Sequence, residues 1–326
     1  MNIGDVAQMA GVSRAAVSRY LNNGYISAEK RERIRKVIEE TGYKPSVMAQ
    51  TLRSKRTRLI GVVIPRINSH SISNVAEGIS GVLSEAGYDM LLATTYNSYE
   101  KELDFLKIFS NNRVDGVILV ATVLTEEHRR ILSGMKIPVV VVGQQISAVP
   151  CIYHDDQGAA YALVRRMIRD GRKEIGYIGV LKEDIAVGRE RYEGYSRALR
   201  EADLPVRPES AVTADFSVKS GSESMDLLLA KAPDLDAVVC ATDRIAVGAL
   251  LNLKRRGLRI PEEIAIAGFG DNLIARVTTP ALTTVHFHYK ESGETAAGKI
   301  LEQLETKTCE TAEIRLGYEL LIREST

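Results

Sequence analysis

Six short apolar runs recur after residue 58, and they constrain the fold more than any other feature of the chain. Each run is continuously apolar rather than alternating, as expected of strands that are covered on both faces. Most neighbouring runs are separated by an amphipathic helical stretch. This alternation predicts an α/β body of two doubly wound subdomains with a cleft between them. The runs are LIGVVI (59–64), GVILVA (116–121), VVVVG (139–143), IGYIGV (175–180), AVVCA (237–241) and IAIAGF (264–269).

The first 58 residues differ from the rest of the chain in charge. They hold twelve Lys and Arg residues against five Asp and Glu residues, a net charge of +7, whereas residues 59–326 hold 31 against 37, a net charge of −6. A basic segment on an acidic body indicates a polyanionic partner for the segment and disfavours nonspecific nucleic-acid binding by the body. A solvated basic surface is the alternative.

The composition is that of a globular protein with two or three cores, since 45% of the 326 residues are hydrophobic and 26% are charged. No window approaches the roughly 20 apolar residues of a membrane span, and the N-terminus lacks a signal-peptide pattern, so we expect a cytoplasmic protein without membrane contact. Cys151, Cys240 and Cys309 form no CxxC pair, which argues against a zinc site and a disulfide framework. Cys240 is predicted to be a buried strand residue, and no metal or cofactor is expected.

Short helices are predicted at the N-terminus. In IGDVAQMAG the apolar residues recur at helical spacing, and Asp5 lies near the helix start, where its charge suits the helix dipole. Gly11 tolerates the positive φ of a tight turn, and Ser13 can cap a second helix from Arg14 to about Leu21. A third helix is predicted from Ser27 to Gly42, with a buried face of Ile34, Val37 and Ile38.

The second helix has an apolar side and a polar side. Val17 and Leu21 are four residues apart and face inward. A helix that lies in the major groove of DNA needs small residues for close approach and arginine for bidentate contacts with guanine edges or phosphates. This helix is therefore predicted to read DNA with an outward side formed by Arg14, Ala15, Ser18, Arg19 and Asn22.

A conditional helix is predicted after Pro45. Residues 47–54 span only about two turns, and helices this short are marginal alone in water. We expect this hinge to fold only when it is docked, with the exposed Leu52 wedged into a base step of the minor groove. A flexible charged linker is the alternative.

The N-terminal strings IGDVAQMAGVSRAAVSRYLNN and KPSVMAQTLRSKRTRLIGVVIP resemble the DNA-binding head and hinge of the lactose/galactose repressor (LacI/GalR) family. The resemblance continues through RVDGVILV, IPVVVVGQ, YEGYSRAL, ATDRIAVGAL, IPEEIAIAGFGDN, PALTTV and LLIREST. It implies a small all-α helix-turn-helix head on a periplasmic-binding-protein-like body. The implied function is sequence-specific transcriptional regulation, most simply repression of carbohydrate-metabolism genes.

By this resemblance Arg14, Ala15 and Arg19 read bases. Asn22 and Tyr25 contact the DNA backbone, and Leu52 is the hinge leucine that intercalates. Ala15 departs from the family, in which a polar residue is frequent, so readout there would depend on a thymine methyl group or on DNA shape. The predicted DNA-contacting set is completed by Ser13, Ser18, Ser27 and Met48.

Ligands of doubly wound sheets bind beyond the carboxyl ends of the strands, and this rule selects candidates without reference to any family. Carboxylates, amides, hydroxyls and an arginine suit a polyhydroxylated solute, because each sugar hydroxyl needs paired partners once it is desolvated. Any one of these residues alone is more often a loop cap than a ligand contact. The candidates are Arg66, Asn68, Ser69, Thr122, Gly143, Gln144, His154, Asp155, Asp156, Thr242, Asp243, Gly270 and Asp271.

The resemblance also bears on the effector. Arg189 matches an arginine that commonly grips the effector, His70 lies near the site in a loop that departs from the family pattern, and Gly143 and Gly270 stand where acids are frequent. A cleft with few carboxylates and with Arg66, His70 and Arg189 nearby would tolerate an anionic effector such as a sugar phosphate or sugar acid. The predicted effector-binding set is Arg66, Asn68, Ser69, His70, Gln144, Asp155, Arg189, Thr242, Asp243 and Asp271.

Other classes of function find little support in the sequence. It contains no GxGxxG after the first strand, no P-loop, no GxSxG and no HExxH, so we expect no enzyme. His286 and His288 would share one face of a strand, but a third metal ligand is not evident. A solute-binding transport receptor has the same body architecture, but it would have no use for the basic head.

The working unit is expected to be a homodimer. One head of about fifty residues buries limited surface, so two heads on a palindromic operator in double-stranded DNA are expected, held together by the body. Closure of the cleft by the effector would change the separation of the two hinges. The predicted parts are a head (1–45), a hinge (46–58) and a body (59–326), with subdomain 1 at about 59–157 and 287–316 and subdomain 2 at about 158–286 and 317–326.

Overall fold

The computed structural model describes residues 1–22, 24–43, 56–111, 114–308 and 311–326. The chain divides into two compact units, residues 1–57 and residues 58–326. Most of the predicted hinge, with Met48 and Leu52, lies outside the described residues, and so does Cys309.

The first unit is a three-helix head, as predicted. Its helices pack around a small core in which Val6, Val17 and Ile34 are fully buried. Ser13 caps the second helix, because its Oγ accepts a hydrogen bond from the N–H of Ala16 at 3.2 Å. The helices are α1 (Ile3–Met9), α2 (Arg14–Leu21) and α3 (Ala28–Thr41).

The N-terminus of α1 and the C-terminus of α3 are both capped by neighbouring residues. Asn2 caps α1 through its side chain, which accepts from the N–H groups of Gly4 and Asp5, while Asp5 accepts from the N–H of Asn2. Gly42 ends α3 in the left-handed region with φ of 63°. Ser27 precedes α3 but makes no side-chain capping hydrogen bond.

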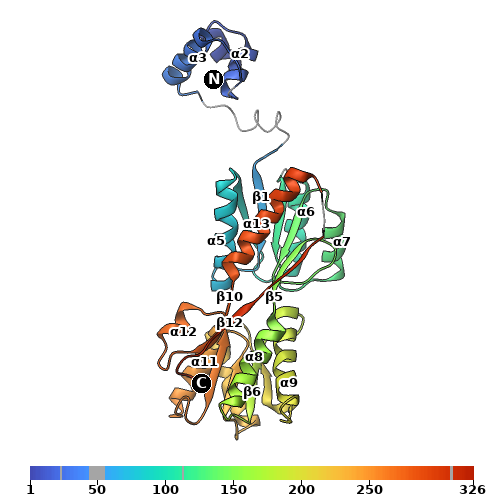
Figure 1. The fold of residues 1–326 in the computed structure, drawn as a ribbon, viewed down its shortest axis with the longest axis vertical. Coiled ribbons are helices and arrows are strands. Elements are labelled where there is room, and N and C mark those ends of the chain that lie inside the picture. The colour runs from blue at the N-terminus through green and yellow to red at the C-terminus, as the bar shows by residue number, and fades with distance from the viewer. Residues whose placement is uncertain (23, 44–55, 112–113, 309–310) are drawn as a thin grey trace. The chain divides into compact units, whose positions relative to one another are not determined.

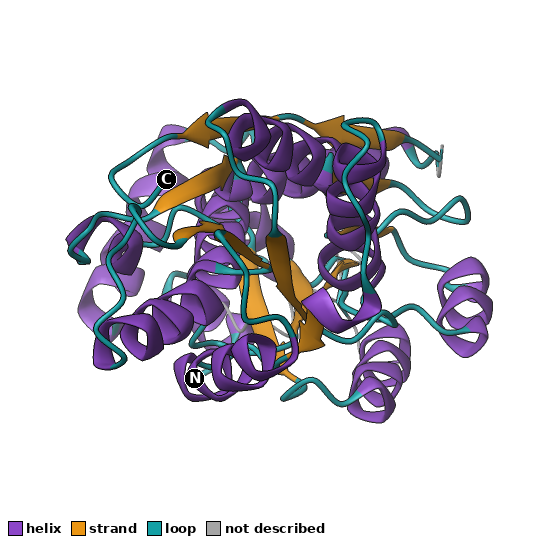
Figure 2. Cartoon of the chain, turned by 90° about the horizontal axis from the view of Figure 1, so that it is seen from below, coloured by secondary structure: helices purple, strands orange, loops and turns teal. Residues whose placement is uncertain are grey.

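The second unit is an α/β body of two lobes, each built on a six-stranded sheet (Figure 1). Figure 2 shows helices on both sides of the strands, which is the doubly wound arrangement that the sequence predicts. The strand orders are β11-β5-β4-β3-β1-β2 in the first lobe and β12-β10-β9-β8-β6-β7 in the second. The pairings are parallel except that β12 runs antiparallel to β10.

The first lobe contains β1 (Leu59–Ile64), α5 (His70–Glu85), β2 (Asp89–Thr94), α6 (Tyr99–Asn111), β3 (Gly116–Val120), α7 (Glu126–Gly134), β4 (Val139–Val142), β5 (Cys151–His154), α13 (Tyr289–Thr306) and β11 (Glu313–Leu316). The second lobe contains α8 (Asp156–Arg169), β6 (Ile175–Gly179), the π-helix η1 (Ile185–Glu190), α9 (Arg191–Arg200), the short helix η2 (Pro208–Ser210), β7 (Ala211–Thr213), α10 (Val218–Lys231), β8 (Ala237–Cys240), α11 (Asp243–Arg255), β9 (Ala265–Phe269), α12 (Leu273–Val277), β10 (Thr283–Phe287) and β12 (Tyr318–Leu321). The chain crosses between the lobes after β5, after β10 and after β11.

The six predicted apolar runs form β1, β3, β4, β6, β8 and β9, and Cys240 is fully buried in β8, as predicted. Four of the other six strands, β2, β7, β11 and β12, lie at sheet edges. An edge strand is only partly covered, so it carries polar residues and does not produce a continuous apolar run. Among the described helices, none is both long and apolar enough to cross a bilayer.

Helix α13, which follows β10, packs closely against α5 of the first lobe. Figure 1 shows α13 running beside α5. A Cβ on Gly78 would lie 2.2 Å from the carbonyl oxygen of Lys290, and a Cβ on Gly293 would lie 2.1 Å from that of Val75. Only glycine allows the two backbones to approach this closely. The first lobe therefore depends on a helix from near the end of the chain.

Candidate functional site

The outward side of α2 is the first candidate site. Arg14, Ala15 and Arg19 are exposed, whereas Ala16 and Val17 on the other side are buried. The structure thus places small and cationic side chains on one exposed helix face, in the arrangement that a DNA groove requires.

Two further predicted contacts extend this face. Asn22 is exposed at the C-terminal end of α2. Tyr25 is 92% exposed, so its ring is accessible to a partner outside the protein. Ser18 is partly buried and Ser27 is exposed.

The cations of this face are free of carboxylate partners. Arg35 on α3 is held between Glu32 and Glu39, but among the described residues no salt bridge involves Arg14 or Arg19. Unpaired guanidinium groups can contact phosphates or guanine edges without first breaking an ion pair.

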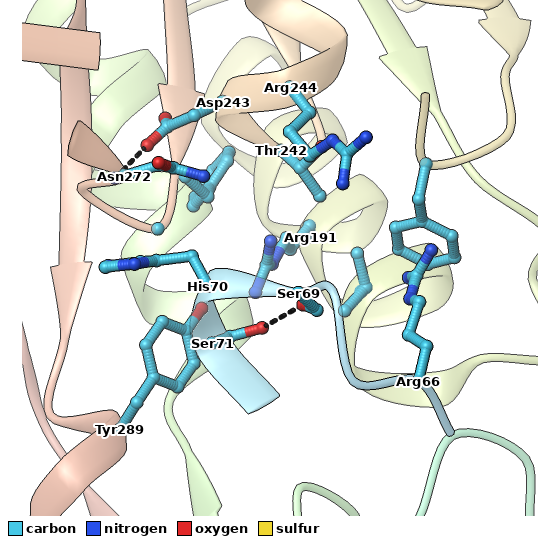
Figure 3. Close-up of a pocket in the computed structure, with 14 residues that line it drawn as sticks. Arg66, Ser69, His70, Ser71, Arg191, Thr242, Asp243, Arg244, Asn272 and Tyr289 are labelled. Carbon is cyan, nitrogen blue, oxygen red and sulfur yellow. Dashed lines mark hydrogen bonds between the residues drawn. The ribbon is translucent and has the colours of Figure 1, made fainter. Parts of the chain in front are cut away.

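The second candidate site is the cleft between the two lobes of the body. Two adjoining pockets there share seven lining residues, and their empty volumes are about 580 and 690 Å³, open solvent included. We call them the outer pocket, which His70 and Arg244 line, and the inner chamber, which Gln144 and His154 line. Figure 3 shows the outer pocket. The residues common to both are Arg66, Ser69, Ser71, Val187, Arg191, Phe216 and Tyr289.

A buried ion pair forms the floor of this space. Arg191 is 4% exposed, and its guanidinium lies 2.6 Å from Asp156 Oδ1. It also donates to the carbonyl oxygen of Ala241 and lies over the rings of Phe269 and Phe287, 4.8 and 5.0 Å from their centroids. Arg191 is therefore fixed before any ligand arrives.

Two further carboxylates line the cleft, and both already accept hydrogen bonds. Asp243 accepts from the Thr284 hydroxyl and, at 2.8 Å, from the N–H of Asn272 (Figure 3). Asp184 Oδ1 accepts from the N–H of Val187 at 3.1 Å and from Gln144 Nε2 at 3.0 Å. Burial raises the pKa of both Asp243 and Asp184 to about 6, against the lowering effect of these hydrogen bonds.

Besides the packing of His154 against Phe287, three contacts of the described residues join the lobes across the cleft. Arg66 of the first lobe lies over the ring of Phe216 of the second, 4.2 Å from its centroid. Arg244 Nη1 donates to the carbonyl oxygen of Asn68 at 3.3 Å. The third contact is the buried hydrogen bond from Gln144 to Asp184. Each depends on the angle between the lobes, so closure and ligand binding must affect one another.

Six of the predicted effector-binding residues line the outer pocket or the inner chamber. They are Arg66, Ser69, His70, Gln144, Thr242 and Asp243. Asn68 lies at the edge and contributes its backbone carbonyl to Arg244. Thr242 also caps α11, because its hydroxyl accepts from the N–H of Ile245 at 3.3 Å.

Three predicted residues do not line either pocket. Asp155 caps α8 by accepting from the N–H of Gly158 at 3.1 Å. Asp271 is buried in an ion cluster with Arg276 and Arg323. Arg189 is exposed at the end of the π-helix, whereas Arg191, two residues on, lines both pockets.

The displacement from Arg189 to Arg191 has a simple geometric reason. Two residues along a helix are separated by about 200°, so their side chains lie on opposite faces. A sequence with arginines at both positions does not say which face meets the cleft. The buried Asp156 decides it, because it can pair only with the arginine that faces inward.

Several lining residues were not predicted. Asp184 and Arg244 follow the strands β6 and β8, so the strand-end rule could have selected them. Phe216 and Tyr289 follow β7 and β10, two strands without a continuous apolar run, and no sequence signal marked them. Among the described residues, no group of three His, Cys, Asp or Glu side chains is arranged to hold a metal ion.

Comparisons with known proteins cover the whole chain. Residues 2–46 match the family described as bacterial regulatory proteins, lacI family, and residues 164–326 match a periplasmic binding protein-like domain. The sucrose operon repressor of Staphylococcus xylosus is 33% identical over 309 residues, covering 95% of each chain.

Solved structures agree with this assignment. The transcriptional regulator CelR in complex with cellobiose is 28% identical with a TM-score of 0.77, and 100% of each chain is covered. The lac repressor dimer bound to operator and the anti-inducer ONPF is 22% identical and shares the fold, with a TM-score of 0.91 and coverage of 100% of this chain and 98% of that one.

Proposed function

The chain belongs to the lacI family of bacterial transcription regulators, whose members are not enzymes, and from this membership we propose that it is a repressor controlled by a small effector. The repressor binds a palindromic operator as a homodimer. The effector is a sugar, sugar phosphate or sugar acid that occupies the cleft and acts allosterically on DNA binding.

The observation that carries this proposal is the exposed, unpaired cationic face of α2. Arg14 and Arg19 project from a capped helix whose other side is buried, so the helix can enter the major groove without unfolding the head. The rest of the chain, with a net charge of −6, would be repelled by the DNA backbone.

The proposed effector site rests on the hydrogen-bonding groups of the cleft. Hydroxyl, amide and charged side chains line it from both lobes, as recognition of a polyhydroxylated compound requires. The sucrose operon repressor and the CelR–cellobiose complex support a carbohydrate-like ligand by analogy.

Selection of binding sites from random duplex DNA tests the proposal. The full chain is expected to enrich a palindrome and to bind random duplex more weakly, with an affinity that falls steeply as salt is added. Enrichment of no common site, or no duplex binding at low salt, would contradict it. If the chain is a monomer in solution but still selects a palindrome, only the homodimer part of the proposal would be contradicted.

A further inference from the structure

Two arginines from opposite lobes face one space in the outer pocket. Figure 3 shows Arg66 entering from the first lobe and Arg244 from the second. Among the described residues, neither guanidinium forms a salt bridge with a carboxylate, and Arg66 Nε is buried without any hydrogen-bond partner. Burial first and the Arg244 charge second lower the pKa of Arg66. The two cations therefore repel one another across the cleft, while the charges of Asp184 and Asp215 act on Arg66 in the opposite direction.

The backbone around these arginines also favours an anion. The 16-residue helix α5 begins at His70 and the 13-residue helix α11 begins at Asp243, and the first residues of both line the outer pocket. Helix N-termini carry partial positive charge and unpaired N–H groups. Asp243, the acid that lines this pocket, already accepts hydrogen bonds from Thr284 and Asn272.

The glycine at position 270 keeps a further carboxylate away from this wall. Its φ is 126°, a conformation that a residue with a side chain rarely adopts. An acid at this position would be strained and would also face Asp243, whose Oδ2 lies 3.7 Å from where the Cβ would be. The outer pocket thus gains no second carboxylate here, and Asp243 is the acid that faces its two arginines.

The inner chamber has the opposite character. His154 lines it, is 6% exposed, and packs against the rings of Phe287 and Tyr289. One ring N–H donates a hydrogen bond to the backbone of His288. Burial lowers the pKa of the imidazole to about 4, so the ring is neutral near pH 7. Its Nε2 is then a hydrogen-bond acceptor, and it has no partner in the protein.

We propose that the cleft is a bipolar site: the anionic group of the effector bridges Arg66 and Arg244, and its hydroxylated part donates a hydrogen bond to His154 in the inner chamber. This inference deepens the proposed function and rests on it for the cleft as the effector site. It restricts the effector to anionic polyols such as sugar phosphates, aldonic acids and uronic acids.

The bridge would couple ligand charge to lobe closure. Without an anion, the repulsion between the two like charges acts against the lobe-joining contacts that Arg66 makes with Phe216 and Arg244 with Asn68. With an anion between them, both arginines are attracted to the same point. The gain is available only when both lobes are near the ligand, so a bridging anion stabilises the closed body more than the open one.

The test is a ligand panel applied to the full chain. Thermal shift and calorimetry are run with inorganic phosphate, with hexose and pentose phosphates, with aldonates and uronates, and with the parent neutral sugars. At least one hydroxylated anion should bind, inorganic phosphate should bind more weakly, and the neutral sugars should not bind.

Variants then separate the two ends of the site. Arg66→Met and Arg244→Met should each weaken binding of the sugar anion and of phosphate by about tenfold to a hundredfold, since each removes a charged hydrogen bond. His154→Phe should weaken binding of the sugar anion by about tenfold and leave phosphate binding unchanged. Arg200→Met, an equal loss of charge on the exposed surface of α9, is the matched control.

Three outcomes would overturn the bipolar site. They are a neutral sugar that binds as tightly as its acid or phosphate, a panel without any binding anion, and arginine variants that bind like the control. A duplex-binding measurement on the same samples keeps the two proposals apart, because a chain that binds the sugar anion but no DNA refutes the repressor while leaving the bipolar site intact.

Discussion

The exposed face of α2, proposed to bind DNA, and the cleft differ in how the chain assembles them. The face on α2 comes from one short stretch, Ser13 to Tyr25, and its charged groups are exposed and unpaired. The cleft collects residues from Arg66 to Tyr289, and much of its charge is buried and already bonded. A site of the first kind can be read from local spacing, whereas a site of the second kind needs the topology of two sheets.

Because the charges on α2 are exposed and many of those in the cleft are buried, substitutions at the two sites should affect binding and stability differently. An exposed charge on α2 contributes little to the folded state, so its loss should affect DNA binding and little else. A buried charge in the cleft is bonded to the fold itself, so its loss should destabilise the body and also change ligand binding. The following variants test this separation, in order of decreasing effect.

The largest effect is expected from Arg191→Met. This change leaves Asp156 buried without its partner and the carbonyl oxygen of Ala241 without its donor, which should cost about 3–5 kcal/mol of the free energy of unfolding. Urea denaturation of the body measures it. Arg189→Met, two residues away on the exposed face, is the control and should change stability by less than about 0.5 kcal/mol.

Equal losses at the two positions would contradict the assignment of Arg191 to the cleft. Partial recovery of stability by Asp156→Asn in the Arg191→Met background would support it, because the second change removes the unpaired charge.

The next effect is a pH dependence of the stability of the body, to which Asp184 in the cleft contributes. The folded-state pKa of Asp184 is raised to about 6 by burial, above the value near 4 of an unfolded aspartate. Because the folded state binds this proton more tightly, protonated Asp184 stabilises the folded body. This contribution to the free energy of unfolding is complete below about pH 4 and is lost as the pH rises through about 6, by an amount on the order of 2 kcal/mol. Asp243 titrates in the same direction.

Asp184→Asn should remove part of this slope. The amide oxygen of asparagine can accept both hydrogen bonds that Asp184 Oδ1 accepts, from Val187 and Gln144, so the geometry is kept while the titration is lost. Thermal melts between pH 5 and pH 8 should show a smaller fall for Asp184→Asn than for the unmodified chain. Asp234→Asn, at an exposed position, should leave this decrease in melting temperature unchanged. If both variants reduced it equally, burial of Asp184 would not be its cause.

These two sites also show how far the sequence could be read. The strands covered on both faces were predictable because full burial requires a continuous apolar run, as in Val139–Val142. The edge strand Asp89–Thr94 was not, because its outward residues meet solvent. The exposed face of α2 followed from one helical period, and the ends of the central strands located Gln144 and Asp243 in the cleft.

What the sequence could not supply was the direction of side chains in segments without a fixed period. Arg189 and Arg191 differ only by a rotation about the helix, and the pairing that decides between them joins Arg191 to Asp156, 35 residues away. Phe216 and Tyr289 reach the cleft because strands of low apolar content end there. Such positions depend on long-range packing rather than local pattern.

On the exposed face of α2, Arg19→Ala should reduce operator binding without reducing the stability of the head. Loss of a base or phosphate contact costs about 1–3 kcal/mol of operator binding, and loss of one phosphate contact lowers the salt slope by about one. Fluorescence anisotropy with the selected palindrome and with random duplex measures both. Arg35→Ala on α3 removes an arginine that is already held by Glu32 and Glu39, so its effect on the ratio of specific to nonspecific affinity should be small. An equal loss for both variants would mean that net charge, and not position on α2, determines binding.

The smallest expected effect separates the two serines that precede helices in the head. Ser13 accepts a hydrogen bond from the N–H of Ala16, whereas Ser27 makes no side-chain capping bond. Ser13→Ala should therefore cost about 1 kcal/mol of local stability, and Ser27→Ala much less. Hydrogen exchange of the α2 and α3 amides, measured on the full chain without DNA, reports each helix separately. Because α2 is capped by Ser13 and carries the proposed DNA contacts, faster exchange in Ser13→Ala should accompany weaker operator binding. Unchanged exchange with weaker binding would assign Ser13 to direct DNA contact instead.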